Sequence, residues 1–80
     1  MDAPTEPAAE VDATGLTCPL PVIELSAAVE RVEVGEVVRL LATDPTARVD
    51  VPVWCRMRRH RLLGLEEEEG RLAFTVERRH

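Results

Sequence analysis

Cysteine is scarce, and both tyrosine and lysine are missing: the 80-residue chain has two cysteines, and its only basic residues are arginines and two histidines. Two cysteines cannot make the dense set of bridges that staples a small secreted domain. The sequence also lacks a CxxC pair and a Cys/His cluster at zinc-binding spacing. These absences argue against a disulfide scaffold and a zinc site, and we expect neither a metal nor a cofactor.

Aromatic rings are equally rare, because Trp54 and Phe74 are the only Trp, Tyr or Phe residues. The core must therefore be mostly aliphatic. Hydrophobic residues make up 45% of the chain, which is enough to cover one sheet with a pair of helices. A chain of this length forms one small domain of marginal stability.

Long apolar runs are also missing. No segment approaches the roughly 20 apolar residues that a membrane-spanning helix needs. The first ten residues have neither the basic start nor the apolar stretch of a secretory signal. We therefore expect a cytoplasmic protein with reduced thiols and no membrane insertion. The net charge of −5 disfavours holding a polyanion, so direct nucleic-acid binding is not expected.

The first half of the chain divides into a tail, a strand, a helix and a second strand. Residues 1–10 are predicted to be a disordered acidic tail, and residues 11–79 to form the domain. A short strand is predicted at 11–13. Spacings of three and four between apolar residues predict an amphipathic helix over 19–32, which Gly35 ends. These apolar residues are Val22, Leu25, Val29 and Val32, flanked by Ile23 and Ala28.

The run at 36–43 predicts a central strand, covered on both faces or on one face and partly on the other. The segment 44–50 contains Pro45 and is predicted to be a loop, with Asp50 as the N-cap of a second helix over 51–59 and Pro52 in its first turn. Candidate buried residues of this helix are Val51, Trp54, Cys55 and Met57.

The last part of the chain predicts a β-hairpin, with partly alternating strands at 61–67 and 71–78 and a turn at 68–70. The alternating apolar residues are Leu63, Leu65, Leu72, Phe74 and Val76. The order βαβαββ implies an α/β two-layer sandwich, with a four-stranded mixed sheet and both helices on one face.

Cys18 stands at the entrance of the first predicted helix, where Pro19 biases it toward extended geometry. Helix entrances carry unpaired N–H groups and the positive end of the helix dipole, which lower the pKa of a thiol. Two registers are open. Either Cys18 is the N-cap and Leu20 supplies the N–H donor, or the helix starts at Pro21. Both predict a sulfur that ionises easily.

The alternative reading of Cys18 is a small buried hydrophobe, since cysteine is among the most buried residue types. Its loop setting argues against deep burial, with Gly15 three residues before it and Pro19 directly after it. For Cys55, which follows Trp54 in the helical pattern, burial is the favoured reading. A second sulfur site or a disulfide between the two cysteines is the less favoured one.

Two ordered blocks of sequence resemble the TusA/SirA-like sulfur-carrier family. "VDATGLTCPLPVIEL" is similar to its signature, in which a short strand and a Gly-Leu turn lead into Cys-Pro-x-Pro. "DPTARVDVPVWCRMRRHRLL" is similar to its second block, and the final hairpin also fits, so the likeness covers residues 11–79. One departure is Arg59, where family members often have glycine before the histidine of the second block.

The resemblance implies a function centred on Cys18. This residue would accept sulfane sulfur as a persulfide from a donor protein, a cysteine desulfurase or a rhodanese-like protein, and pass it to an acceptor protein. In relay terms this is a transferase. The supporting motif residues would be Gly15, Leu16, Pro19, Leu20 and Pro21. The final acceptor stays open among tRNA thiolation, molybdenum-cofactor synthesis and sulfur oxidation.

Charged residues outside the motif have a structural interpretation as well as a functional one. Four arginines near the end of the second helix form either a solvated face or a docking patch for acidic partners: Arg56, Arg58, Arg59 and Arg61. The acidic block at 66–69 reads as a solubilising turn. Three aspartates are interpreted as turn and cap residues: Asp12, Asp44 and Asp50. His60 is interpreted as the end of the second helix.

Two other functions remain alternatives. Cys18 could belong to a redox-sensing or regulatory interaction module, in which its oxidation changes the affinity for a partner. The chain could also be a structural accessory domain of a membrane sulfur transporter.

Overall fold

The computed structural model describes residues 6–80, which form four strands and two helices. In chain order these are β1 (Ala9–Ala13), α1 (Leu20–Val29), β2 (Val37–Ala42), α2 (Ala47–Arg58), β3 (Arg61–Glu68) and β4 (Arg71–Glu77).

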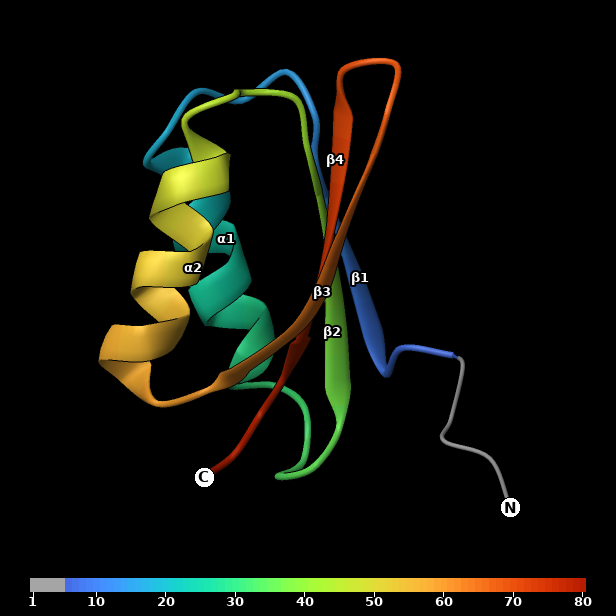
Figure 1. Ribbon diagram of the computed structural model, residues 1–80. Helices are drawn as coiled ribbons and strands as arrows, with labels where there is room; N and C mark the ends of the chain where they lie inside the picture. Colours follow the sequence, from blue (N-terminus) through green and yellow to red (C-terminus); the bar gives the residue numbers. More distant parts are fainter. Residues whose placement is uncertain (1–5) are drawn as a thin grey trace.

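The four strands form one mixed sheet in the order β1-β2-β4-β3. β1 and β2 are parallel, and β4 is antiparallel to both β2 and β3. Both helices lie against the same face of this sheet, and no described helix covers the opposite face (Figure 1). The predicted α/β two-layer sandwich is therefore confirmed. No helix in the described part of the chain is both long and apolar enough to cross a membrane.

The core lies between the helices and the sheet and is built by strict alternation on the two central strands. β2 buries Val38, Leu40 and Ala42, and β4 buries Leu72, Phe74 and Val76, as predicted for β4. Leu25 of α1 and Val51 of α2 are fully buried above them. Burying one such side chain contributes about 1.5–3 kcal/mol. This aliphatic layer fixes both helices over the sheet.

The start of the domain and the end of α1 differ from the sequence prediction. β1 begins at Ala9, two residues before the predicted strand, and the Ala8 N–H donates to the Val37 carbonyl at 2.8 Å. Residues 1–5 of the predicted tail lie outside the described residues. α1 ends at Val29 and not at residue 32, so Gly35 does not end it. Gly35 instead forms the turn before β2, with φ of +93°.

Arg78 accounts for the early end of α1. Its guanidinium donates hydrogen bonds to the carbonyls of Val29, Glu30 and Val32, at 3.3, 3.4 and 2.6 Å. The last carbonyls of a helix have no partner within the helix, and a cationic donor satisfies them well. The chain can therefore leave the helix after Val29 and still bury Val32.

The start of α2 was also predicted wrongly. The helix begins at Ala47 after Thr46, so Asp50 is not the N-cap but a first-turn residue, and Pro52 lies inside the helix. The Asp44 side chain accepts the Thr46 N–H at 2.9 Å, and the Asp44 carbonyl accepts the Ala47 N–H at 3.0 Å. Asp44 thus closes the turn that starts the helix, within the segment predicted to be a loop.

The predicted inward residues of α2 and β3 were partly wrong. In α2, Val51 and Cys55 are buried, Trp54 is half-buried, but the Met57 side chain is 75% exposed. In β3 a register shift between Leu62 and Gly64 turns Leu63 outward, so Leu62 packs on the core instead. Leu65 is also exposed. The bulge reverses the alternation that the sequence pattern suggests for this edge strand.

Candidate functional site

Cys18 lies in the loop between β1 and α1, and this loop is tied to the one between β2 and α2. The Cys18 N–H donates to Oδ2 of Asp44 at 2.8 Å, and the Gly15 N–H donates to Oγ1 of Thr43 at 2.9 Å. Gly15 has φ of +84°, a left-handed conformation that favours glycine. Cys18 is partly buried and packs against the edge of the core, as does Leu16. The peptide bond from Cys18 to Pro19 is cis.

The entrance of α1 has no free amide to offer the sulfur. The N-cap is Pro19, which has no N–H, so neither predicted register is correct. The Leu20 N–H donates to the Thr17 carbonyl at 2.9 Å, and the Val22 N–H donates to the Pro19 carbonyl at 3.0 Å. Pro21 has no N–H either. The donors expected to stabilise a thiolate are therefore occupied or missing.

The pKa of Cys18 is raised to about 11, which contradicts the predicted lowering. Desolvation by burial is the largest cause. Next come the side chain and the charge of Asp50, followed by the charge of Asp44. With this pKa, only about one molecule in ten thousand carries the thiolate at neutral pH.

Asp44 and Asp50 are thus site residues that sequence reasoning placed only as turn and cap residues. Asp44 accepts the N–H groups of both Cys18 and Thr46, and these two hydrogen bonds lower its pKa below the usual value. It is therefore ionised at neutral pH. Both residues lie in the second block that resembles the family, and no chemical role had been assigned to that block. Their position there was the signal that could have identified them.

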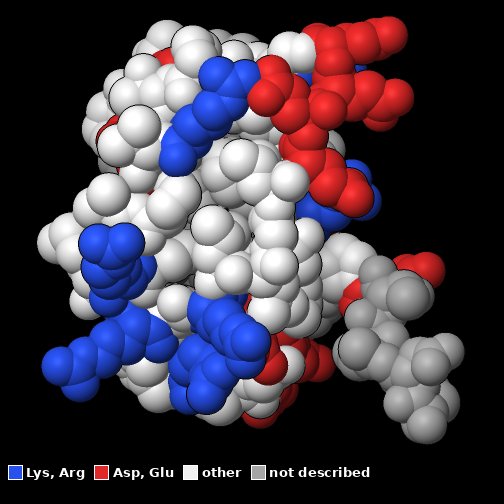
Figure 2. Space-filling view, in the orientation of Figure 1, with Lys and Arg blue, Asp and Glu red and all other residues white. Residues whose placement is uncertain are grey.

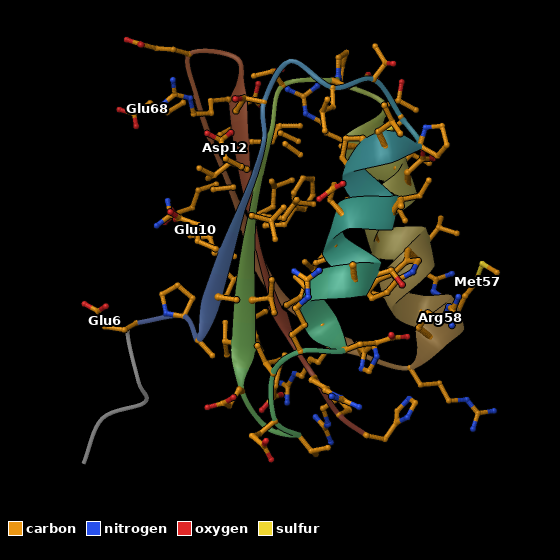
Figure 3. All side chains as sticks on the ribbon, turned by 180° about the vertical axis from the view of Figure 1, so that it is seen from behind. Glu6, Glu10, Asp12, Met57, Arg58 and Glu68 are labelled. Atoms are coloured by element: carbon orange, nitrogen blue, oxygen red, sulfur yellow. The ribbon has the colours of Figure 1, made fainter. Side chains whose placement is uncertain are left out.

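A shallow apolar groove of about 230 Å³ lies between the start of α1 and the middle of α2, at Pro19, the residue after Cys18. It is lined by Pro19, Val22, Asp50, Val53, Trp54 and Met57. Further apolar side chains of the two helices are solvent-exposed: Leu20, Ile23 and Val49. Met57 extends from α2 away from the sheet, on the opposite side of the molecule from Glu10, Asp12 and Glu68 (Figure 3). The helix side thus presents exposed apolar side chains, some of them at the groove that Pro19 lines.

The charges are segregated along the molecule. Arginines gather near the C-terminal end of α2, and glutamates gather on the β3–β4 hairpin at the far end (Figure 2). The predicted arginine cluster lies on the last turn of α2 and the start of β3, and Arg79 lines a hollow with three residues of this region: Arg59, His60 and Arg61. No arginine lines the groove at Pro19.

His60 follows α2, as predicted for the residue that ends it. Its ring stacks on His80 with centroids 4.8 Å apart, and its Nδ1 accepts the Arg79 N–H at 3.1 Å. Burial, followed by the charges of His80, Arg78 and Arg58, lowers its pKa. This favours the neutral ring that accepts the bond from Arg79, so His60 serves to pack the C-terminal residues against α2.

Cys55 is buried, as the favoured reading predicted, and burial raises its pKa to about 11. It is not disulfide-bonded to Cys18, since both cysteines are free. Within residues 6–80, no three His, Cys, Asp or Glu side chains are grouped so as to hold a metal ion. Cys18 is therefore the partly exposed thiol of the described chain.

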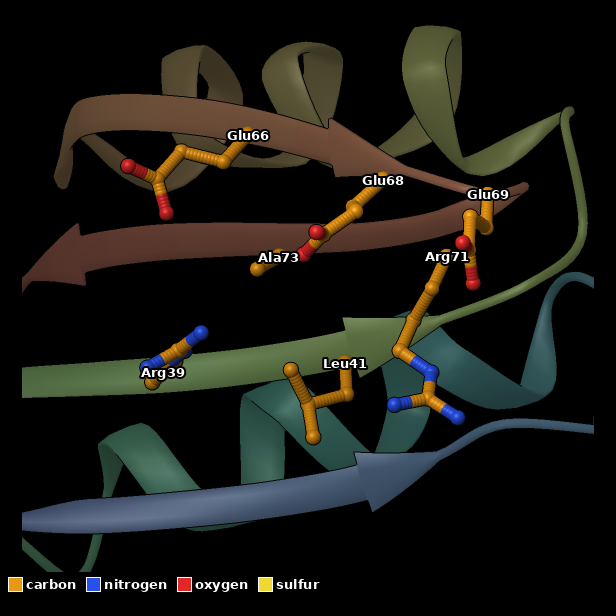
Figure 4. Close-up of a pocket in the computed structure, with 7 residues that line it drawn as sticks. All are labelled: Arg39, Leu41, Glu66, Glu68, Glu69, Arg71 and Ala73. Atoms are coloured by element: carbon orange, nitrogen blue, oxygen red, sulfur yellow. The ribbon is translucent and has the colours of Figure 1, made fainter.

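A second hollow, of about 260 Å³, lies on the sheet face that the helices leave open (Figure 4). Its lining side chains come from β2 and the β3–β4 hairpin: Arg39, Leu41, Glu66, Glu68, Glu69, Arg71 and Ala73. None of these is a thiol or an imidazole, so the hollow offers no sulfur chemistry of its own.

Fold and site together define a class: a small α/β sandwich that presents one partly exposed thiol at the entrance of its first helix. The sequence places the chain within that class more narrowly. Residues 9–78 match the family model described as sulfurtransferase TusA, and the chain belongs to this family.

Individual relatives agree with this assignment. The sulfur carrier protein TusA of Pseudomonas entomophila (strain L48) is 41% identical over 71 residues, which cover 89% of each chain. That of Pseudomonas putida (strain W619) is 38% identical over 73 residues, or 91% of each chain. Among solved structures, the SirA-like protein from Desulfitobacterium hafniense superposes with a TM-score of 0.78 at 26% identity. The match covers 90% of this chain and 99% of that one.

Proposed function

We propose that this protein is a sulfur carrier, in which Cys18 accepts sulfane sulfur as a persulfide from a donor protein and passes it to an acceptor protein. The observation that carries the proposal is the position of Cys18: a partly exposed cysteine within Cys-Pro-Leu-Pro, in a chain of the TusA family. Relatives named sulfur carrier protein cover most of its length.

The transfer is a thiol–persulfide exchange. The Cys18 sulfur, as its thiolate, attacks the terminal sulfur of a donor cysteine persulfide. The donor's S–S bond breaks as the new S–S bond forms on Cys18, and the donor cysteine leaves as a thiolate. That thiolate takes up a proton to balance the one that Cys18 released. Delivery repeats the exchange, with an acceptor thiol as the attacking group.

The surroundings of Cys18 suit a carrier that must not lose its cargo. A second thiol close by would attack the persulfide and release sulfide. Cys55 is 2% exposed within the α2 layer of the core, and its raised pKa keeps it protonated. It is therefore a poor attacking group, and a loaded Cys18 would keep its sulfur until a partner arrives.

Partners would dock on the helix side. The apolar residues around the groove offer contact area beside the sulfur, and the arginine cluster of Arg56, Arg58, Arg59 and Arg61 offers a flanking positive patch for an acidic surface. We propose cysteine desulfurases or rhodanese-like proteins as donors. A cytoplasmic location, which keeps Cys18 reduced, stays a prediction.

The redox-sensing alternative is less favoured by the site. Sensor cysteines are exposed and have lowered pKa values, because the thiolate reacts with peroxide. The raised pKa of Cys18 gives it little thiolate at neutral pH. A carrier can work with a largely protonated thiol if that thiol is activated within the donor complex. A sensor that reacts with peroxide in solution has no partner to activate its thiol.

The test is loading by a cysteine desulfurase with cysteine as the sulfur source, followed by intact mass measurement. Wild-type protein should gain the mass of one sulfur atom, which a reductant removes. The Cys18→Ser variant should fold normally and gain nothing, whereas the matched Cys55→Ser variant should still load. Absence of loading by several active desulfurases and rhodaneses would contradict the proposal.

A further inference from the structure

We propose that a hollow at the C-terminal end of α2 binds two or more neighbouring carboxylates of a partner protein. The hollow has a volume of about 550 Å³ and is lined by four residues: Arg59, His60, Arg61 and Arg79. Arginines gather on this part of the surface, although the chain has a net charge of −5 (Figure 2). The inference rests on the proposed carrier function and deepens it, because it names the chemistry by which a relay partner is held.

The hollow carries positive charge that the described chain does not neutralise. Three ion pairs form within residues 6–80, and neither Arg59 nor Arg61 takes part in one. Arg79 pairs with Glu77, but the paired nitrogen and oxygen are 3.6 Å apart and the Arg79 side chain is half exposed. Such an exposed pair contributes little, so incoming carboxylates can replace it.

The helix dipole accounts for only part of this charge. Arg56 and Arg58 lie in the last turn of α2, where a positive charge complements the negative end of the helix. Arg61 is the first residue of β3, and Arg79 follows β4. The fold therefore brings arginines from two further segments to the end of this helix, which points to a ligand that they share.

The backbone around the hollow is held in place without a ligand. The Arg59 N–H donates to the Arg56 carbonyl at 3.3 Å, and the His60 N–H donates to the Cys55 carbonyl at 2.9 Å, which closes the end of α2. The Arg79 N–H donates to Nδ1 of His60 at 3.1 Å. Because the segments that carry the arginines are already fixed, binding orders only side chains, and this lowers its entropic cost.

Arg59 occupies a position where glycine would cost less. Its φ of 62° and ψ of 38° lie in the left-handed region, which glycine adopts freely and arginine adopts at a cost in stability. Backbone strain of this kind is often stored at functional sites. A guanidinium held here at such a cost, in one hollow with Arg61, points to a use for its charge.

The charge of the whole chain favours carboxylates on a protein over a nucleic acid. A guanidinium binds carboxylate and phosphate groups with similar forked geometry, so the arginines alone do not select between them. A nucleic acid extends beyond the hollow and is repelled by the net charge of −5 and by the glutamates of the β3–β4 hairpin. A short acidic segment of a folded partner can bind within the hollow and avoid this repulsion.

The hollow is also placed so that a bound partner can approach Cys18. Arg58, in the last turn of α2, lines a further shallow hollow between α1 and α2 together with Val22 and Trp54. Val22 and Trp54 also line the groove at Pro19, the residue after Cys18. A partner held at the arginines can therefore extend along both helices toward the loop that carries the sulfur.

The experiment titrates isotope-labelled protein with a capped peptide of four glutamates at low salt, where charges are least screened, and follows backbone amide signals by NMR. The signals of residues 59–61 and 79 should shift, whereas a peptide of four glutamines should shift none of them. Arg59→Gly should weaken binding by about twofold to fivefold, because one charge leaves the hollow. The matched control Arg71→Gln removes the same charge from the hairpin and should bind as wild type does.

The other outcomes overturn the inference. Absent shifts, or shifts spread over the whole surface, would show that the hollow is not a site. Unchanged binding by Arg59→Gly, or equal weakening by Arg59→Gly and Arg71→Gln, would show that the arginines of the hollow are not the ligands. Tighter binding of inorganic phosphate or of a short uridylate RNA than of the glutamate peptide would make the hollow a phosphate site.

The variants separate binding from folding and from sulfur transfer. Arg59→Gly relieves the left-handed geometry, so this variant is expected to keep the fold. Arg61→Gln is a second variant that should weaken binding by a similar factor. The peptide needs neither Cys18 nor a sulfur donor. A protein that loads sulfur but does not bind the peptide overturns this inference alone, and one that binds the peptide but never loads contradicts the proposed function alone.

Discussion

The backbone N–H of Cys18 donates a 2.8 Å hydrogen bond to the carboxylate of Asp44, and this bond joins the loop before α1 to the loop before α2. The same carboxylate accepts the Thr46 N–H that closes the first turn before α2. One side chain thus places the sulfur and starts the second helix.

Asp44 should make folding stability depend on acid pH. Its pKa is lowered in the folded protein, so its contribution is present above the usual value of 3.8 and is lost as the pH falls through the folded value. Between the folded and the unfolded pKa, Asp44 is protonated in the unfolded chain and still ionised in the folded protein. Denaturant unfolding of Asp44→Asn should show a flatter loss of stability in acid than wild type. Equal curves would show that the carboxylate charge contributes nothing. A residual slope is expected from Asp12, whose pKa Thr14 also lowers.

Arg59 is expected to be a position where glycine stabilises the fold. It follows α2 with φ of 62° and ψ of 38°, and such left-handed geometry costs a side-chain-bearing residue about 1–2 kcal/mol. Arg59→Gly should raise the free energy of unfolding by about 1 kcal/mol in denaturant titrations. The neighbouring Arg58→Gly, within the helix, should lower it by a similar amount. Destabilisation by both changes would contradict this account.

Arg78 is expected to matter more than its neighbour Arg79. Its guanidinium satisfies three carbonyls at the end of α1, and charged hydrogen bonds of this kind contribute about 1.5–3 kcal/mol. Arg78→Ala should therefore lower the unfolding free energy by about 2 kcal/mol, measured by urea titration. Arg79→Ala removes an exposed pair with Glu77, which is worth about 0–1 kcal/mol. Equal losses would show that capping of α1 is not what Arg78 contributes.

The general architecture could be predicted from the sequence because it depends on local periodicity. The alternation of Leu72, Phe74 and Val76 and the helical spacing of Leu25 and Val29 each report which face is buried. The start of α2 could not be found this way, because a side-chain bond from Asp44 forms the turn. The inward residue of β3 was missed for a similar reason, since the bulge after Leu62 interrupts the alternation.

The site itself was predicted only in part. Cys18 is identified by its local motif, but its electrostatic environment comes from Asp44 and Asp50, which lie in a different loop and helix. The sequence neighbours of Cys18 suggested that the amides of α1 would lower its pKa. In the folded structure burial and two carboxylates from other segments raise its pKa instead. The sign of a pKa shift therefore depends on contacts between distant segments, which a helix-entrance argument does not include.

Alkylation of the free carrier decides between these two views of Cys18. With the pKa at about 11, the rate with iodoacetamide should rise about tenfold for each pH unit from neutral pH upward, because only the thiolate reacts. Mass mapping of the alkylated peptides separates Cys18 from Cys55, which should stay unmodified while the protein is folded, since it is 2% exposed. A rate that already levels off near neutral pH would mean that the entrance of α1 activates the thiol after all.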